Sequence, residues 1–140
     1  IPGLAKVLEV ENAVLMKAEL ILKPVVGTFE NSELPTSLVY SKVDKKNNIL
    51  TIYYNSENVR ISGPLVINDA LYNENTYYSL DITSYVADEL SDSYFVAGSS
   101  ALLLSYSSPG FSSTANSIVF GDINNKNQKA KLKLYFLYYE

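Results

Sequence analysis

Four carboxylates lie close together in the sequence, and paired carboxylates are the groups that many glycosidases use. They are Asp81, Asp88, Glu89 and Asp92. A glycosidase would need two of them to face each other across a groove, within roughly 10 Å. The simpler interpretation places Asp81 at a strand end near a helix N-terminus, where its charge is favourable, and the others on the polar face of a short helix. We therefore predict no catalytic residue, and a carbohydrate-active enzyme is the alternative.

Histidine and cysteine are both absent from the sequence. This excludes His-based triads, histidine general bases, the common zinc sites and disulfides. The loop "GDINNKN", residues 121–127, spaces Asp122 and several asparagines in a way that can suit Ca²⁺, but Lys126 and Asn127 stand where an EF-hand-like loop needs an oxygen ligand and a glycine. A turn explains the same residues, so we predict no metal site and no cofactor.

Tyrosine is frequent, with 12 copies and no tryptophan. Outward tyrosines on neighbouring strands can stack on sugar rings, because each ring offers an apolar face and a polar hydroxyl. Tyrosine also forms cross-strand pairs that only stabilise a sheet, which is the competing interpretation. A loop phenylalanine in "SSPGFSS" joins the outward tyrosines. The candidate ligand-binding set is Tyr53, Tyr77, Phe111, Tyr135 and Tyr139.

Alternating apolar residues predict several short strands. The segments are 13–23, 37–43, 49–54, 76–82, 101–106, 116–120 and 130–139. The turn-forming stretch "DKKNN" predicts that the second and third segments form a hairpin. After Ile82 the spacing becomes helical, which predicts one short helix near residues 83–91 with Thr83 or Ser84 as its cap. This order of elements indicates an all-β antiparallel jelly-roll β-sandwich, with the helix covering one end of the core.

The inward side of these elements is the predicted core. Its tyrosines are Tyr54, Tyr78 and Tyr138. Its other members are Met16, Leu20, Leu22, Leu80, Ile82, Val86, Leu102, Leu104, Val119, Leu132, Leu134 and Phe136.

Length and charge limit the partners that we expect. The 140 residues suit a single domain, residues 1–140, and the net charge of -4 argues against nucleic acid as a partner. No apolar run approaches the ~20 residues of a membrane-spanning helix. Because the chain starts "IPGLAKVLEV", without an initiator Met or a signal sequence, we expect it to be a fragment of a longer protein.

Several stretches resemble a known family. The chain contains "MKAELIL" followed by "LPTSLVY", then "LDITSYV", "ALLLSY", "NSIVFGD" and a closing "KLKLYFLYY". In this order they resemble the C-terminal part of a Bacteroidetes family of surface lipoproteins, domain-of-unknown-function family four-two-seven-zero. The chain is more distantly similar to DNRLRE-type jelly-roll domains, some of which resemble carbohydrate-binding modules.

The resemblance implies a cell-envelope setting. It implies a non-catalytic module of a lipoprotein, located at the outer-membrane surface or in the periplasm through a lipid anchor outside this fragment. The partners that it implies are a polysaccharide, another surface protein or the upstream part of the same protein. It carries over no catalytic or ligand-binding residue.

Overall fold

A computed structural model describes residues 13–28, 34–68, 75–91, 99–107 and 118–139. In these ranges the chain is all-β with one short helix, as predicted. No helix in the described part of the chain has the length and apolar character needed to span a membrane. The elements are β1 (Ala13–Leu22), β2 (Ser37–Asp44), β3 (Ile49–Ile52), β4 (Ser62–Val66), β5 (Tyr77–Asp81), α1 (Thr83–Ser91), β6 (Ser100–Tyr106) and β7 (Lys131–Tyr138).

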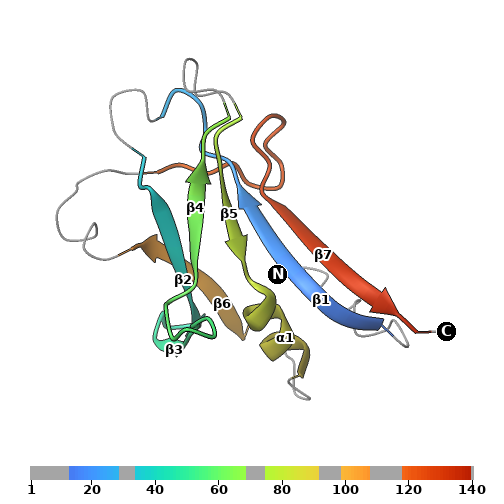
Figure 1. The fold of residues 1–140 in the computed structure, drawn as a ribbon. Helices are drawn as coiled ribbons and strands as arrows, with labels where there is room; N and C mark the ends of the chain where they lie inside the picture. The colour runs from blue at the N-terminus through green and yellow to red at the C-terminus, as the bar shows by residue number, and fades with distance from the viewer. Residues whose placement is uncertain (1–12, 29–33, 69–74, 92–98, 108–117, 140) are drawn as a thin grey trace.

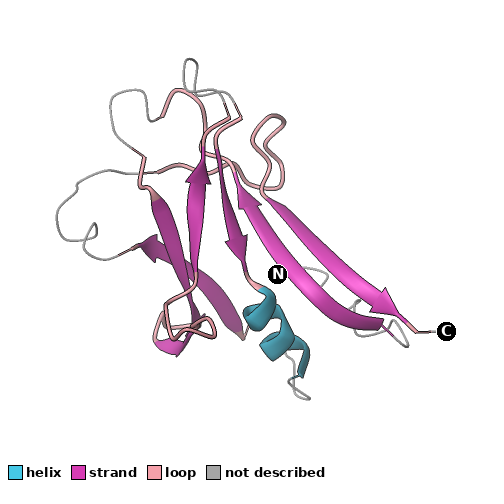
Figure 2. Ribbon diagram, in the orientation of Figure 1, coloured by secondary structure: helices cyan, strands magenta, loops and turns pink. Residues whose placement is uncertain are grey.

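The strands form one antiparallel sheet that bends into a sandwich. The strand order is β3-β2-β4-β5-β1-β7. Strand β6 also pairs with β2 but lies outside this linear order. Figure 1 shows the two halves splaying apart, with β2, β3 and β6 on one side and β1 and β7 on the other. The helix lies between the halves at the open end, as Figure 2 also shows. The sandwich is therefore open rather than closed.

Strand β4 joins the two halves, and the sequence pattern does not predict it. Its residues 62–64 pair with β2 and its last two residues pair with β5. Glycine and proline are poor strand residues, so the segment "SGPLV" does not show the alternation of apolar and polar residues that predicts a strand. Gly63 is needed here because a Cβ would collide with the Leu80 side chain and lie 2.7 Å from the Ser79 carbonyl oxygen. The backbone of β4 thus passes directly over β5.

Strand β1 contains a bulge that changes which residues face the core. Its register with β7 shifts between Leu15 and Lys17, so Met16 is the extra residue. Ala18 faces the core, and so does Leu20 as predicted, whereas Met16 points outward and is 59% exposed. The prediction of Met16 as a core residue is wrong, because the prediction assumed that inward and outward residues alternate strictly, and the bulge breaks this alternation.

Most of the other predicted core residues are confirmed. Phe136 is half-buried. The pattern missed that both faces of β2 are buried, so Leu38, Val39, Tyr40 and Val43 also belong to the core. The residues that are buried or that pack against the buried cluster as predicted are Leu20, Leu22, Leu80, Ile82, Val86, Leu102, Leu104, Leu132 and Leu134.

The predicted strand at 116–120 is reduced to a single bridge in the described residues. Phe120 bridges Pro24, and residues 116 and 117 lie outside the described part of the chain. The Phe120 ring meets Tyr78 edge to face, with ring centroids 5.8 Å apart. This contact turns Phe120 inward and leaves its neighbour Val119 exposed. The prediction of Val119 as a core residue is therefore wrong.

Helix α1 begins where predicted, but its cap is a different residue. The Asp81 Oδ1 atom accepts hydrogen bonds from the backbone N–H and the hydroxyl of Thr83, at 3.0 and 2.6 Å. Asp81 caps the helix, in place of Thr83 or Ser84, and its charge is favourable there. The Thr83 hydroxyl oxygen accepts a hydrogen bond from the Ala18 N–H at 2.9 Å, which ties the helix to β1.

The largest core side chains are tyrosines whose hydroxyl groups are hydrogen-bonded. Tyr40 donates to the Asp81 carbonyl at 2.8 Å, and Tyr78 donates to the Pro35 carbonyl at 2.7 Å. The predicted inward position of Tyr78 is confirmed. Tyr54 and Tyr138 are exposed, so the prediction that they belong to the core is wrong.

We expect alkaline pH to unfold the domain through these tyrosines. Burial is the main cause that raises the pKa of Tyr40, Tyr53 and Tyr78 above the ordinary 10.0. The unfolded chain ionises them near the ordinary value, so stability is complete below pH 10 and falls as the pH rises above it. Circular dichroism and tyrosinate absorbance, recorded in one pH titration, should change together for these rings. Full ionisation of all tyrosines in a folded domain would contradict this.

Substitution of Gly63 tests the contact between β4 and β5. Gly63→Ala should lower the free energy of unfolding by roughly 2 kcal/mol or more, because the Ser79 carbonyl is backbone and cannot rotate away. Ser62→Ala, at the exposed neighbouring position, is the control and should change it by less than about 0.5 kcal/mol. Urea denaturation measures both, and equal stability of the two variants would mean that β4 is not packed on β5 as described.

Candidate functional site

Tyr53 does not belong to a ligand-binding surface. It is only 8% exposed, so its prediction as an outward residue is wrong. Its ring packs on Tyr40 and Tyr85, with centroids 5.4 and 6.3 Å away. Its hydroxyl donates a hydrogen bond to the Asp88 Oδ2 atom at 3.1 Å. The ring and hydroxyl of Tyr53 thus contribute to the packing of β2 against α1.

The register between β2 and β3 explains this reversal. Thr51 lies opposite Lys42, whose ammonium contacts α1. Tyr53 is two residues further along and faces the same side, while Ile52 and Tyr54 face solvent. The sequence prediction placed Tyr54 inward and Tyr53 outward. The aromatic and ionic contacts on the side of Thr51 and Tyr53 give the opposite arrangement.

The other predicted tyrosines lie on one face of the sheet but at opposite ends. Tyr135 is on β7, Tyr139 directly follows it, and both are exposed. Tyr77 begins β5 and is half-buried. Most of the length of β1, on the order of 30 Å, separates the two ends. Phe111 lies outside the described residues.

The exposed tyrosines belong to an apolar surface on β1 and β7. We call it the β1–β7 face, and its members are between 44% and 60% exposed. Val14 pairs directly with Leu137, and the bulge adds a methionine to the same side. The members of the face are Val14, Met16, Tyr135, Leu137 and Tyr139.

Charged residues border the β1–β7 face along the sheet. Lys17 lies opposite Tyr135 in the register of β1 and β7. The Lys133 Nζ atom is 3.8 Å from a Glu19 carboxylate oxygen, and the Ser79 hydroxyl donates to the other oxygen of that carboxylate at 2.6 Å. An apolar centre with a polar rim is the usual composition of a binding surface.

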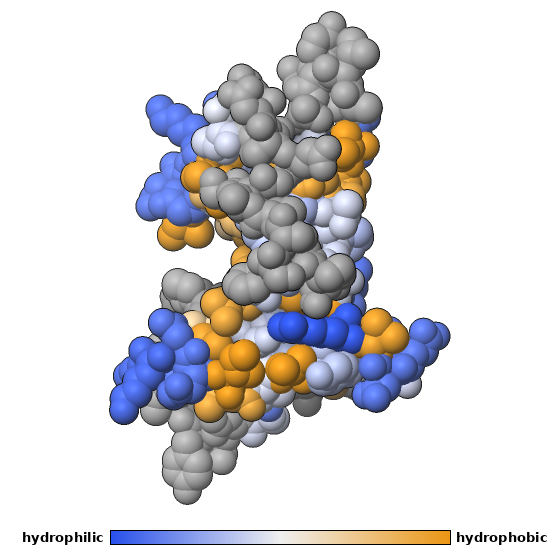
Figure 3. All heavy atoms as spheres, turned by 90° about the vertical axis from the view of Figure 1, so that its left-hand side faces the viewer, coloured by the Kyte–Doolittle hydropathy of each residue, from blue (hydrophilic) through white to orange (hydrophobic). Residues whose placement is uncertain are grey.

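A second group of exposed apolar side chains surrounds β3. It comprises Ile49, Leu50, Ile52 and Val59. Figure 3 views the molecule from this side and shows hydrophobic residues between strongly hydrophilic ones. The strand has only four residues, and its turn carries two lysines, at positions 45 and 46. Short length and lysines are features that keep a strand edge from pairing with another chain.

An ion-pair network connects β2 to α1. The Lys42 Nζ atom lies 2.9 Å from the Asp88 Oδ2 atom and 2.7 Å from the Glu89 Oε1 atom. Tyr53 donates to the same Asp88 oxygen, and the Ser100 hydroxyl donates to the same Glu89 oxygen at 2.8 Å. The network thus joins β2, α1, β6 and the residue after β3.

Both acids of this network contact the same group, the Lys42 ammonium. Glu89 is only 7% exposed, so the prediction that it lies on a solvated helix face is wrong; Asp92 lies outside the described residues. Burial by itself lowers the pKa of Lys42, but hydrogen bonds with Glu89 and Asp88 outweigh it and raise the pKa above its ordinary value. The hydrogen bond from Lys42 is the main cause that holds the pKa of Asp88 below its ordinary value. Lys42 and Asp88 are therefore held in their charged forms.

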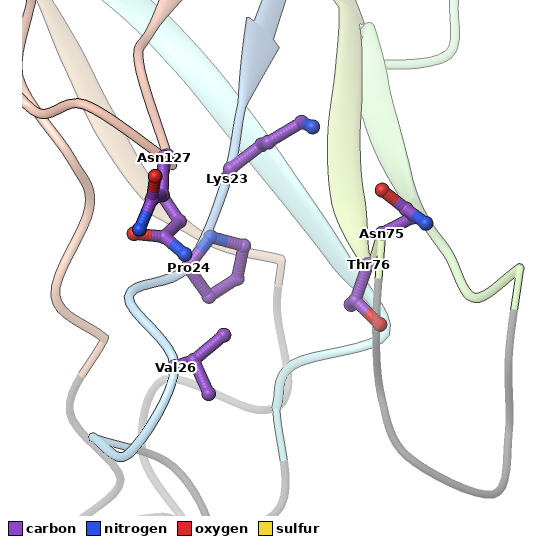
Figure 4. Close-up of a pocket in the computed structure, with 7 residues that line it drawn as sticks. Lys23, Pro24, Val26, Asn75, Thr76 and Asn127 are labelled. Atoms are coloured by element: carbon purple, nitrogen blue, oxygen red, sulfur yellow. The ribbon is translucent and has the colours of Figure 1, made fainter.

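A small pocket lies at the opposite end of β1 from the β1–β7 face. Its volume is about 70 Å³, enough for a few water molecules. Figure 4 shows Lys23 and Pro24 between Asn127 on one side and Thr76 on the other. The Thr76 hydroxyl is buried and has no hydrogen-bond partner among the described residues.

The "GDINNKN" loop beside this pocket is built from side-chain turns. The Asp122 Oδ1 atom accepts hydrogen bonds from the N–H groups of Asn124 and Asn125, both at 2.9 Å. The Asn125 Oδ1 atom accepts from the N–H groups of Asn127 and Gln128 at 3.0 and 2.9 Å. A cation would need these oxygens as ligands, but they already accept hydrogen bonds from backbone N–H groups of the loop.

Removal of the Lys42 ammonium should destabilise the fold. Lys42→Met leaves two neighbouring carboxylates without their cation, and we expect a loss of roughly 2 to 3 kcal/mol, less than for a fully buried pair because Asp88 is partly exposed. Lys45→Met, in the adjacent exposed turn, is the matched control and should cost less than about 0.5 kcal/mol. The double variant Lys42→Met/Glu89→Gln should recover part of the loss in chemical denaturation. Equal stabilities of Lys42→Met and Lys45→Met would contradict the role of the network.

The ion pair between Lys42 and Asp88 should make the stability of the fold depend on pH in the acidic range. Because the pKa of Asp88 is lowered in the folded state, its contribution is complete above the ordinary 3.8 and is lost as the pH falls through the folded value. The difference in melting temperature between the parent and Lys42→Met should therefore shrink below pH 3.8. A difference that stays constant down to full protonation would show that Asp88 does not contribute through its charge.

Comparison of the chain with protein-family models, with curated proteins and with solved structures finds no match. The candidate site must therefore be judged from its own geometry. Lys42 and Glu89 of the ion-pair network are largely buried, and the pocket holds little more than water. The β1–β7 face is the exposed apolar surface that brings two of the predicted tyrosines together, and it is the candidate functional site.

Proposed function

We propose that the chain is a non-catalytic module of a bacterial envelope lipoprotein, at the outer-membrane surface or in the periplasm, and that the β1–β7 face binds a polysaccharide. The observation that carries this proposal is the exposure of Tyr135 and Tyr139 on one side of β7, with Leu137 between them. The resemblance of "LDITSYV" and "KLKLYFLYY" to surface lipoprotein domains supports the setting.

The chemistry of the face suits sugar rings. Tyr135 and Tyr139 are four residues apart on one side of an extended chain, so their side chains start about 14 Å from each other. Sugar rings can stack on both, while Lys17 and Lys133 beside the face can donate hydrogen bonds to sugar hydroxyls. Each stacking contact contributes about 0.5 to 1.5 kcal/mol beyond area burial, so binding in the micromolar to millimolar range is expected.

Two alternatives make different demands on the structure. A scaffold that only docks another protein, or the upstream part of its own chain, would use the same face without sugar stacking. A carbohydrate-active enzyme would need two acids that face each other across a groove. The adjacent acids Asp88 and Glu89 instead both contact Lys42, and this supports the binding module over the enzyme.

A glycan array followed by calorimetric titration tests the proposal. Tyr135→Ala and Tyr139→Ala should each weaken binding of the polysaccharide selected by the array by roughly tenfold or less, the amount that one stacking contact supplies. Tyr54→Ala, at an exposed tyrosine outside the β1–β7 face, is the control and should bind like the parent. The absence of any bound glycan, or equal binding by all three variants, would overturn the proposal, and release of shorter sugars would favour the enzyme.

A further inference from the structure

We infer that β7 pairs with β7 of a second copy of this chain, antiparallel, and that this pairing joins two β1–β7 faces into one. The inference deepens the proposed function, because the joined surface is the one that would hold the polysaccharide. It identifies the partner of the β7 edge as the chain itself.

The first observation is that the outer edge of β7 has no partner strand among the described residues. The strand has eight residues and stands last in the sheet order, paired with β1 on one side only among the described strands. Figure 1 shows it at the outer margin of the molecule. A row of free N–H and C=O groups of this length is a template for another strand. Its last four residues, "YFLY", carry neither charge nor proline, the two side-chain features that commonly block such pairing.

The other free edges differ from β7 in a way that favours β7. Strand β3 is half as long as β7. Strand β6 has one strongly exposed large apolar side chain, Leu103. On β7 a free backbone edge coincides with exposed Tyr135, Leu137 and Tyr138, among the residues that the structure describes.

The second observation is that β7 is complementary to itself in one register. A pairing centred on Tyr135 places this ring opposite Tyr135 of the second copy, on the outer side of the sheet. Lys133 then lies opposite Leu137 and Lys131 opposite Tyr139, so that no lysine faces another lysine and one of them can lie over an aromatic ring. A centre two residues earlier would place Lys133 against itself, which is unfavourable. The charges therefore argue against that register and are compatible with the one centred on Tyr135.

The inner side of the same register is apolar throughout. Leu134 lies opposite Phe136 of the second copy, and Leu132 lies opposite Tyr138. Tyr138 is 62% exposed although its position in the alternation directs it toward the core side. Pairing would cover this ring and extend the inner face of the sheet across both copies.

The available area predicts a weak dimer. The side chains of Tyr135, Tyr138 and Tyr139 are between 46% and 62% exposed, which corresponds to on the order of 300 Å² in each copy. Pairing would bury part of this area together with the backbone edge, while the outer faces of Tyr135 and Tyr139 stay accessible, so the interface is smaller than the roughly 1,000 Å² of a stable specific complex. Small interfaces belong to weak, transient associations, and we expect a dissociation constant of roughly 10 μM to 1 mM.

Joining two faces changes what the surface can hold. Directly paired residues of antiparallel strands lie on the same side, so positions 135, 137 and 139 of both copies share one outer surface. A polysaccharide chain that spans both copies would contact two sets of tyrosines and bind more tightly than to either alone.

Sedimentation velocity across a concentration series tests the pairing, without any glycan present. The parent should shift from monomer to dimer as its concentration approaches about 1 mM. Because Tyr135 lies opposite itself, Tyr135→Lys and Tyr135→Glu should each weaken self-association at least roughly tenfold, whereas an equimolar mixture of the two should associate as well as the parent. Leu103→Lys, at an exposed position on β6, is the control and should behave like the parent. Circular dichroism confirms that each variant is folded.

Each outcome decides one question. A parent that stays monomeric at all concentrations, or single Tyr135 variants that associate like the parent, would overturn the inference. A mixture that fails to associate would overturn the register centred on Tyr135. Dimers without glycan binding would overturn the proposed function and leave this inference standing, whereas glycan binding by a protein that stays monomeric would do the reverse.

Discussion

The passage of β4 over β5 at Gly63 is the constraint on which the rest of this fold depends. One short strand pairs with β2 through its first residues and with β5 through its last two, so the two halves of the sandwich meet at a single strand. A side chain at position 63 would push the halves apart, because the neighbouring atoms include the backbone of β5.

The open end of the sandwich is closed by polar contacts as well as by apolar ones. Tyr85 and Val86 of α1 enter the core, and Asp88 and Glu89 of the same helix hold Lys42 of β2. Asp81 and Thr83 fix the beginning of the helix to β5 and β1. Hydrogen bonds and ion pairs require definite geometry, so the helix has one position, where apolar contacts alone would allow it to slide.

Sequence reasoning succeeded where apolar residues recur with a regular strand or helix period, and it failed where a tertiary contact or a bulge interrupts that period. The period of β7 placed Leu132 and Leu134 in the core, and the change of period after Ile82 located α1. The bulge at Met16 broke the alternation that was used to place it. Glycine and proline concealed β4, and the ion pair between Lys42 and Asp88 links residues 46 positions apart, a separation that no local pattern reports. Two of the five candidate ligand-binding residues, Tyr135 and Tyr139, lie together, since neighbouring positions on one strand need no knowledge of tertiary contacts.

The bulge in β1 has a chemical consequence for the β1–β7 face. Met16 is the chain's only methionine, and the bulge moves its thioether from the core side to the exposed side of the sheet. Oxidation to the sulfoxide adds a polar oxygen to a flexible apolar side chain. In a packed core this change would disturb folding, but at this position it alters only the polarity of an exposed surface. The oxidation state of one sulfur atom thus changes the polarity of the face at one of its five positions.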